Sequence, residues 1–217
     1  MSSTDVIEAG PFGEWLAAMR AVLRGEQSAD VPCGDCVGCC ISSYPIPLRP
    51  TDGVALETVP SQYLHLPADS AGGLARMGFR EDGSCPMLCA GKCSIYSDRP
   101  QTCRDYDCRI YAAAGLLPDG ARPVIQERVL AWRFAFGSAD EQAAAEAVQR
   151  AARFISSNSA LFPAGMRAGS ATAVAVLAVK TQALFADVTG TPGMDDSIQQ
   201  RVRRLVDAAH AFDQGAT

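Results

Sequence analysis

The chain has 217 residues, of which 48% are hydrophobic, so it can form one large domain or two small ones around a real hydrophobic core. Its net charge of −5 argues against a general nucleic-acid-binding protein, because attraction to phosphates needs clustered basic residues. The basic residues Arg201, Arg203 and Arg204 have acidic neighbours and are interpreted as a solvated helix face. The first ten residues lack the basic and apolar regions of a signal peptide, and the apolar stretch 171–179 is too short to span a bilayer. We therefore expect a cytoplasmic protein that binds neither nucleic acid nor membrane.

The first predicted element is a helix over residues 12–23, where apolar side chains recur at helical spacing, and Gly25 is expected to end it. From about residue 27 to residue 50 the chain reads as a loop, and this loop contains the first group of cysteines. A short helix is expected to follow the loop, with Thr51 or Asp52 as its cap.

The second half of the chain contains one predicted strand and three predicted helices. Apolar side chains alternate over residues 129–136, which favours a strand over the helical alternative. The sequence SADE at 138–141 is a capping-box signature and predicts a helix that starts there, with an apolar face through residue 155. Two further stripes at helical spacing predict helices, and their members are Val174, Leu177, Ala178, Thr181, Leu184, Phe185 and Val188, and Ile198, Val202, Leu205, Ala209 and Phe212.

Together these elements predict a mainly α fold with an irregular, cysteine-rich, metal-stapled region and little β structure. We divide the chain at residue 115. Residues 1–115 contain the first helix and a metal-chelating region. Residues 116–217 form a helical region that is expected to pack on the same core, because helices with apolar stripes must bury them against a neighbour.

Nine cysteines are concentrated in two segments, four within CGDCVGCC and five within CPMLCAGKCSIYSDRPQTCRDYDC. Disulfides are not expected, because the number is odd, no export signal is present, and a bridge between adjacent cysteines would strain the peptide between them. Thiolates are soft ligands that suit zinc and iron, and C-x2-C pairs turn two sulfurs toward one ion. The run Cys33-x2-Cys36-x2-Cys39 also matches the first three ligands of a bacterial ferredoxin motif. The adjacent Cys39 and Cys40 fit a site with two metals or a cluster of several irons.

In the second cysteine segment a helix is predicted to start between Ser97 and Pro100, since proline is tolerated in a first helical turn. Cys103 and Cys108 would face different sides of an ideal helix, so Cys108 is expected at or beyond the helix end. Basic residues near the cysteines are expected to offset the thiolate charge, and acidic residues are expected to orient the arginines. The alternative is that all of these are ordinary surface charges. The residues concerned are Lys92, Arg99, Arg104 and Arg109, and Asp98, Asp105 and Asp107.

The two cysteine segments together resemble the YkgJ-type cysteine-cluster family, which is described as a zinc- or iron-chelating domain. The resemblance covers residues 30–110, where C-x2-C-x2-C-C is followed by C-x-x-L, then by C-x-I-Y-x-x-R-P-x-x-C-R and a last cysteine. It implies a metal or cluster site more firmly than any reaction, and Cys89 lies outside the pattern. The metal ligands that the resemblance implies are Cys33, Cys36, Cys39, Cys40, Cys85, Cys93, Cys103 and Cys108.

Three functions remain open on the sequence. The first is an iron–sulfur protein with an electron-transfer or oxidoreductase role, which requires a protein or redox partner, and we favour it slightly. The second is a structural zinc protein that acts as a protein-interaction module through its helical half. The third, a protein-lysine methyltransferase-like enzyme, ranks last because the sequence shows no glycine-rich cofactor loop. The sequence identifies no catalytic residue.

Overall fold

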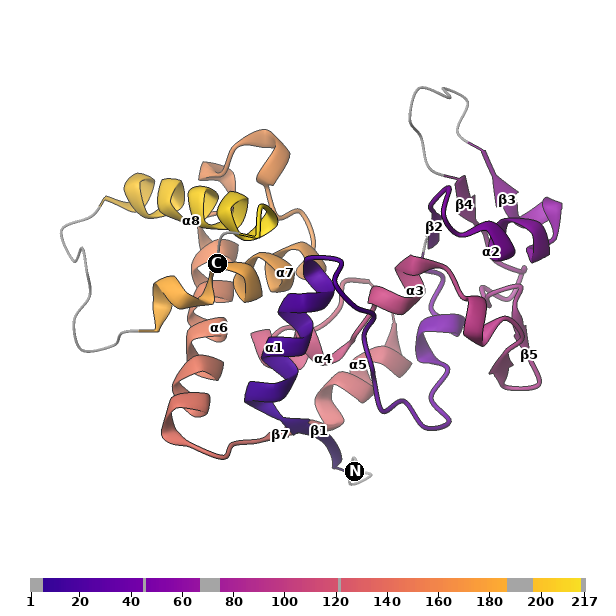
Figure 1. Cartoon of the computed structure of the whole chain (residues 1–217), viewed down its shortest axis with the longest axis horizontal. Coiled ribbons are helices and arrows are strands. Elements are labelled where there is room, and N and C mark those ends of the chain that lie inside the picture. Colours follow the sequence, from indigo (N-terminus) through magenta and orange to yellow (C-terminus); the bar gives the residue numbers. More distant parts are fainter. Residues whose placement is uncertain (1–5, 45, 67–74, 121, 187–196, 216–217) are drawn as a thin grey trace. The chain divides into compact units, whose positions relative to one another are not determined.

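The computed structural model of the chain describes residues 6–44, 46–66, 75–120, 122–186 and 197–215 (Figure 1). The chain forms two compact units. Unit 1 consists of Met1–Gln27 and Cys108–Thr217, and unit 2 consists of Ser28–Asp107. The N-terminal helix therefore belongs to the same unit as the C-terminal helices. The division that the sequence suggested, at residue 115, instead placed this helix with the cysteines. The predicted mainly α fold with little β structure is confirmed.

Unit 1 is built from helices and one short parallel strand pair. Helix α6 contacts α1, α4 and α7, and α7 also contacts α8. Strand β1 pairs with β7 in parallel. The bounds of the elements are β1 (Ile7–Pro11), α1 (Phe12–Leu23), α4 (Arg109–Ala114), α5 (Pro123–Ala131), β7 (Trp132–Ala135), α6 (Ala139–Ser157), α7 (Ala171–Thr181) and α8 (Ile198–Asp213), with 3-10 turns at Ser159–Leu161, Ala164–Met166 and Gln182–Phe185.

The apolar stripes read from the sequence form the core of unit 1. Phe12 on α1, Val148 and Ile155 on α6, Ala178 on α7 and Phe212 on α8 are all fully buried. The four predicted helices are therefore confirmed. Two members of the third stripe, Leu184 and Phe185, lie in the 3-10 turn after α7 and not in the helix itself. Val188 lies outside the described residues.

The strand predicted over residues 129–136 is wrong in its first part. Residues 129–131 end helix α5, and only Trp132–Ala135 form strand β7. Pro123 at the first helical position opens α5. Ile125 and Val129 are both buried while Glu127 between them is exposed, which is helical and not strand spacing. The apparent alternation depended on Leu130 as an inward-facing residue, but its side chain is 55% exposed.

Ser138 caps helix α6, as the SADE signature predicts. Its hydroxyl accepts a hydrogen bond from the Glu141 N–H at 3.2 Å, and the Glu141 carboxylate accepts one from the Gly137 N–H at 2.7 Å. Ser138→Ala should therefore lower the free energy of unfolding by about 1 kcal/mol, because it leaves one N-terminal donor without its acceptor. Urea denaturation followed by helical circular dichroism measures the loss. Ser156→Ala, at an exposed position of the same helix, is the control, and an equal loss there would contradict the capping role.

Unit 2 consists of short elements around a separate core. A three-stranded antiparallel sheet has the order β2-β4-β3, and β5 and β6 form a hairpin. The elements are β2 (Ile46–Leu48), α2 (Gly53–Thr58), β3 (Leu64–His65), β4 (Ala75–Met77), β5 (Leu88–Cys89), β6 (Lys92–Cys93) and α3 (Gln101–Asp105), with 3-10 turns η1 (Gly38–Ile41), η2 (Ser61–Tyr63) and η3 (Tyr96–Asp98). The buried core contains Ile46, Leu48, Ala55, Val59, Met77, Cys85, Met87 and Ile95.

Asp52 immediately precedes α2, which confirms the expected start of this short helix. Its side chain makes no capping hydrogen bond to α2 and points into another set of contacts. Among the described residues, no helix combines the length and the apolar character needed to cross a membrane.

Candidate metal centre

Cysteines from three segments of unit 2 come together around its core. Cys85 belongs to that core with 5% of its surface exposed, and Cys40, Cys93 and Cys103 pack against it. The Cys85 N–H donates to the Cys40 carbonyl at 2.7 Å, which joins the loop before β5 to the turn η1. Cys39 precedes Cys40 on η1, and their sulfur atoms are 3.9 Å apart. These five residues, Cys39, Cys40, Cys85, Cys93 and Cys103, are called the thiol cluster below.

The thiols of the cluster influence one another's ionisation. The contact with the Cys40 thiol lowers the pKa of Cys39 to about 7, and the charge of Arg99 contributes in the same direction. The same contact, together with burial, raises the pKa of Cys40. Burial is the main cause that raises the pKa of Cys85, and it raises the pKa of Cys103 to about 12, with the charges of Cys39, Cys85 and Cys93 adding to the latter shift. The cluster is therefore one electrostatic environment.

The remaining cysteines are placed differently. Cys33 and Cys36 form a turn in unit 2, in which the Cys36 N–H donates to the Cys33 carbonyl at 3.0 Å. Cys108 belongs to unit 1, where it precedes α4 and its sulfur accepts a hydrogen bond from the Trp132 indole N–H at 3.3 Å. The role of all eight predicted cysteines as metal ligands stays a prediction. Cys89 is exposed on β5, opposite Lys92 in the hairpin.

Helix α3 begins later than predicted. Residues 96–98 form the separate turn η3, Pro100 is extended, and the helix starts at Gln101. The physical reason is that proline disfavours helical geometry in the residue before it, and Arg99 indeed has a ψ of 146°. The helix ends at Asp105, so Cys108 lies beyond it, as expected.

Of the charged residues expected to support the thiols, Arg99 does so. Its guanidinium lies over the Tyr96 ring at 4.1 Å, donates to the Tyr96 carbonyl at 2.8 Å, and acts electrostatically on Cys39 and Cys103. Arg109 instead donates to the Ala9 carbonyl within unit 1. Three others make their contacts elsewhere. Asp98 accepts from the Ser97 hydroxyl, and Arg104 and Asp105 contact Gln101, Asp52 and Arg49.

Sequence reasoning missed Arg80, which holds the loop that carries Cys85. Its two guanidinium nitrogens donate to the carbonyls of Leu88 and Pro86 at 2.9 and 2.7 Å. Gly83 is also needed in this loop, since its φ is +79° and an added Cβ would lie 2.6 Å from the Ser43 hydroxyl. Arg80 lies outside the cysteine pattern and before its second part, so no spacing signal could have identified it.

The donor set suits soft metals, although the sulfurs do not converge on one point. All nine cysteines are described, and none forms a disulfide. Within the part of the chain that the structure describes, no three His, Cys, Asp or Glu side chains are close enough to hold a single ion. What the structure provides is a group of five thiols in one electrostatic environment, four of them in or against one core, with Arg99 as the nearby positive charge.

Comparison with known proteins agrees with this geometry. Residues 32–122 match the family model described as "CxxCxxCC: Putative zinc- or iron-chelating domain". No curated protein and no solved structure matches the chain. The matched segment contains all nine cysteines and nearly all of unit 2. Through residues 32–122, the chain is therefore similar to zinc- or iron-chelating domains of the CxxCxxCC type.

Proposed function

We propose that unit 2 binds a metal centre through the thiol cluster, and that this centre is an iron–sulfur cluster with an electron-transfer or oxidoreductase role. The observation that carries the proposal is the meeting of five thiols from three separate segments around Cys85. Four of these thiols lie in or against one core, and soft thiolate ligands for zinc or iron must meet in this way.

The number and spread of the thiols favour iron–sulfur over a single zinc ion. One zinc ion takes four ligands at about 2.3 Å from the metal, so its sulfurs must lie very close together. The thiol cluster already exceeds four members, and Cys33 and Cys36 precede it directly in the chain. A group of several iron and sulfide atoms accepts more widely spaced thiolates.

Each part of unit 2 has a defined task in this proposal. The thiolates hold the centre, Arg99 offsets part of their negative charge, and Arg80 fixes the loop of Cys85. An iron–sulfur cluster supplies one-electron transfer, with a potential that depends on charge and on hydrogen bonds near the sulfurs. We infer a protein redox partner and the reducing environment of the cytoplasm, where cysteines stay available as ligands.

A structural zinc protein is the second candidate, and the architecture of unit 2 favours it specifically. The unit is held by strands of two or three residues and helices of five or six. Four-thiolate zinc sites stabilise such loop-rich folds directly. The cysteines would then be scaffolding, and the protein would act by binding a partner through its helices.

The test is purification without air, followed by visible absorption and by analysis of iron, zinc and acid-labile sulfide per chain. A brown protein with iron and sulfide supports the iron–sulfur proposal. A colourless protein with one or two zinc ions replaces it with the structural zinc function. A reduced protein that contains neither metal and takes up neither would overturn both.

Metal affinity should rise with pH. Metals bind thiolates, so binding must displace protons from thiols such as Cys103, whose pKa is raised to about 12. Cys39, with a pKa of about 7, requires proton release only below neutral pH. We therefore expect affinity to increase between pH 6 and 9, with a steeper slope below pH 7. Competition with a chromophoric chelator at several pH values measures this, and a flat profile would show that the raised-pKa thiols are not ligands.

A further inference from the structure

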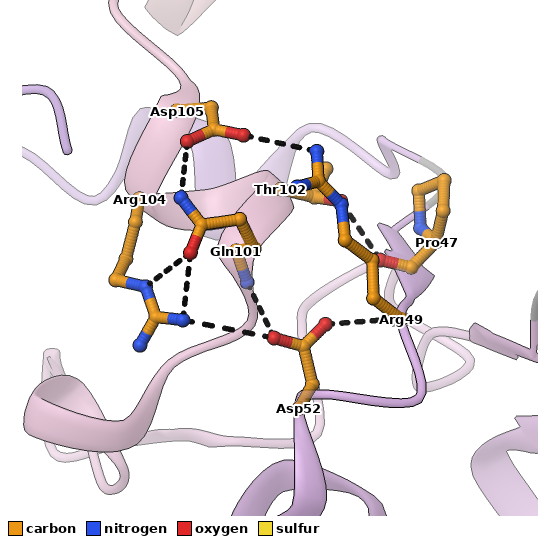
Figure 2. Close-up of polar contacts among 7 residues, drawn as sticks. All are labelled: Pro47, Arg49, Asp52, Gln101, Thr102, Arg104 and Asp105. Carbon is orange, nitrogen blue, oxygen red and sulfur yellow. Dashed lines mark hydrogen bonds and ion pairs between the residues drawn. The ribbon is translucent and has the colours of Figure 1, made fainter. Parts of the chain in front are cut away.

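A buried carboxylate joins the helix of Cys103 to the turn before α2. The Asp52 side chain is 1% exposed, and its two oxygens accept hydrogen bonds from different parts of unit 2. Oδ2 accepts from the Arg49 N–H at 2.7 Å, and Oδ1 accepts from the Gln101 N–H at 2.9 Å (Figure 2). Gln101 is the first residue of α3, and Cys103 is the third.

Side chains of α3 close a ring of polar contacts with the same turn (Figure 2). Arg104 donates through two nitrogens to Gln101 Oε1 at 3.1 and 2.8 Å, and it lies 3.8 Å from Asp52 Oδ1. The Gln101 amide donates to Asp105 Oδ1 at 2.5 Å, and Asp105 Oδ2 pairs with Arg49 at 3.2 Å. The ring therefore runs from the carboxylate through α3 and back to the turn at Arg49.

Burying a carboxylate is costly unless hydrogen bonds and a positive charge compensate it. Two N–H donors and Arg104 provide that compensation for Asp52. In return, the carboxylate supplies what α3 lacks, because Pro100 offers no side-chain acceptor for the free N–H groups of the first turn. A helix of five residues has little stability of its own, so such outside contacts decide whether it forms.

We propose that Asp52 is a positioning residue for Cys103: through Gln101 and Arg104 it fixes the first turn of α3 and keeps the Cys103 thiol within the thiol cluster. Cys103 donates its N–H to the Pro100 carbonyl inside this turn, and Arg104 follows it directly in the chain. The view of Cys103 as a metal ligand rests on the proposed function, whereas the placement of its thiol does not.

The first test measures the placement without metal. Asp52→Asn preserves the size of the side chain but replaces one acceptor oxygen with a donor and removes the charge opposite Arg104. In the reduced, metal-free full chain, we expect iodoacetamide to alkylate Cys103 roughly tenfold faster than in the parent protein, as mass spectrometry of individual peptides would show. Cys85, in the core, and Cys89, already exposed, should react at unchanged rates.

A matched control is available in the same helix. The Thr102 hydroxyl donates to the Pro47 carbonyl at 2.8 Å, so Thr102→Val also removes one contact between α3 and the β2 segment. This change leaves the Asp52 contacts in place. We expect the alkylation rate of Cys103 to stay at the parent value in Thr102→Val.

The second test uses cobalt(II), whose thiolate charge-transfer absorption reports how many sulfurs are bound. Asp52→Asn should weaken cobalt binding by about 10- to 100-fold, the usual loss when a residue that orients a ligand is replaced, and should lower the charge-transfer intensity. In a Cys103→Ser background the same change should cause no further loss, because both act through one ligand.

The outcomes separate the two proposals. An unchanged alkylation rate at Cys103 in Asp52→Asn would overturn the positioning role, as would equal acceleration at Cys85, which would indicate general unfolding of unit 2. Additive losses of cobalt affinity in the double variant would also overturn it. Faster alkylation of Cys103 alone, in a parent chain that binds no cobalt, zinc or iron, would retain the positioning role and overturn the metal function.

Discussion

Replacing Cys85 with serine should abolish stable metal binding. Cys85 is the member of the thiol cluster that lies inside the core, and its N–H bonds the segment of Cys40. The hydroxyl of serine is a poor ligand for soft metals and cannot be deprotonated near neutral pH. Loss of a residue that only orients a ligand costs about 10- to 100-fold in metal affinity, so loss of this ligand should exceed about 100-fold. Metal content after gel filtration and visible absorption measure the effect.

Cys89→Ser is the matched control for this experiment. Cys89 lies four residues from Cys85, outside the family pattern and exposed on β5. The same chemical change there should leave metal content and colour at the level of the parent chain. If Cys89→Ser removed the metal as completely as Cys85→Ser, the assignment of the ligands would be wrong.

Removal of the metal should lower the stability of unit 2 without unfolding it, and leave the helices of unit 1 fully protected. Metal sites rarely exist before folding, so the free energy of metal binding contributes directly to the stability of the surrounding fold. Unit 2 has only short elements to replace that contribution, whereas α6 and α7 of unit 1 bury long apolar faces. Hydrogen–deuterium exchange resolved by peptide should show faster exchange in β2, β4 and α3 than in the metal-bound chain after treatment with EDTA, and after oxidation and EDTA if the centre contains iron.

Two comparisons make this result interpretable. Re-addition of the metal to reduced protein should restore protection in unit 2, which separates metal loss from damage to the thiols. The peptides of α6 serve as the internal reference. Unchanged exchange in unit 2 after complete metal removal would show that the unit folds on its own core and that the centre serves chemistry alone.

The sequence predicts the helices of unit 1 well because their signals are local. Each stripe repeats at helical spacing over ten or more residues, and Ser138 is an N-cap that acts within its own turn. The bounds of strand β7 could not be predicted from the apolar pattern, because the apolar run from Val129 to Phe136 contains both the end of α5 and the strand. Only burial distinguishes them, and burial depends on the neighbours that each side chain meets.

The resemblance to zinc- or iron-chelating domains was also visible in the sequence, because pairs of cysteines in short loops can bind one metal ion through local spacing alone. By itself the sequence established the soft donor set, the mainly helical remainder and the exclusion of Cys89 from the pattern. Only the tertiary structure showed that Cys40, Cys93 and Cys103 pack against the core that contains Cys85, and that Arg80 and Asp52 bond the loop of Cys85 and the first turn of α3. The contacts of Asp52 with Gln101 cross 49 residues, and no local pattern records a hydrogen bond between segments that meet only when the chain folds.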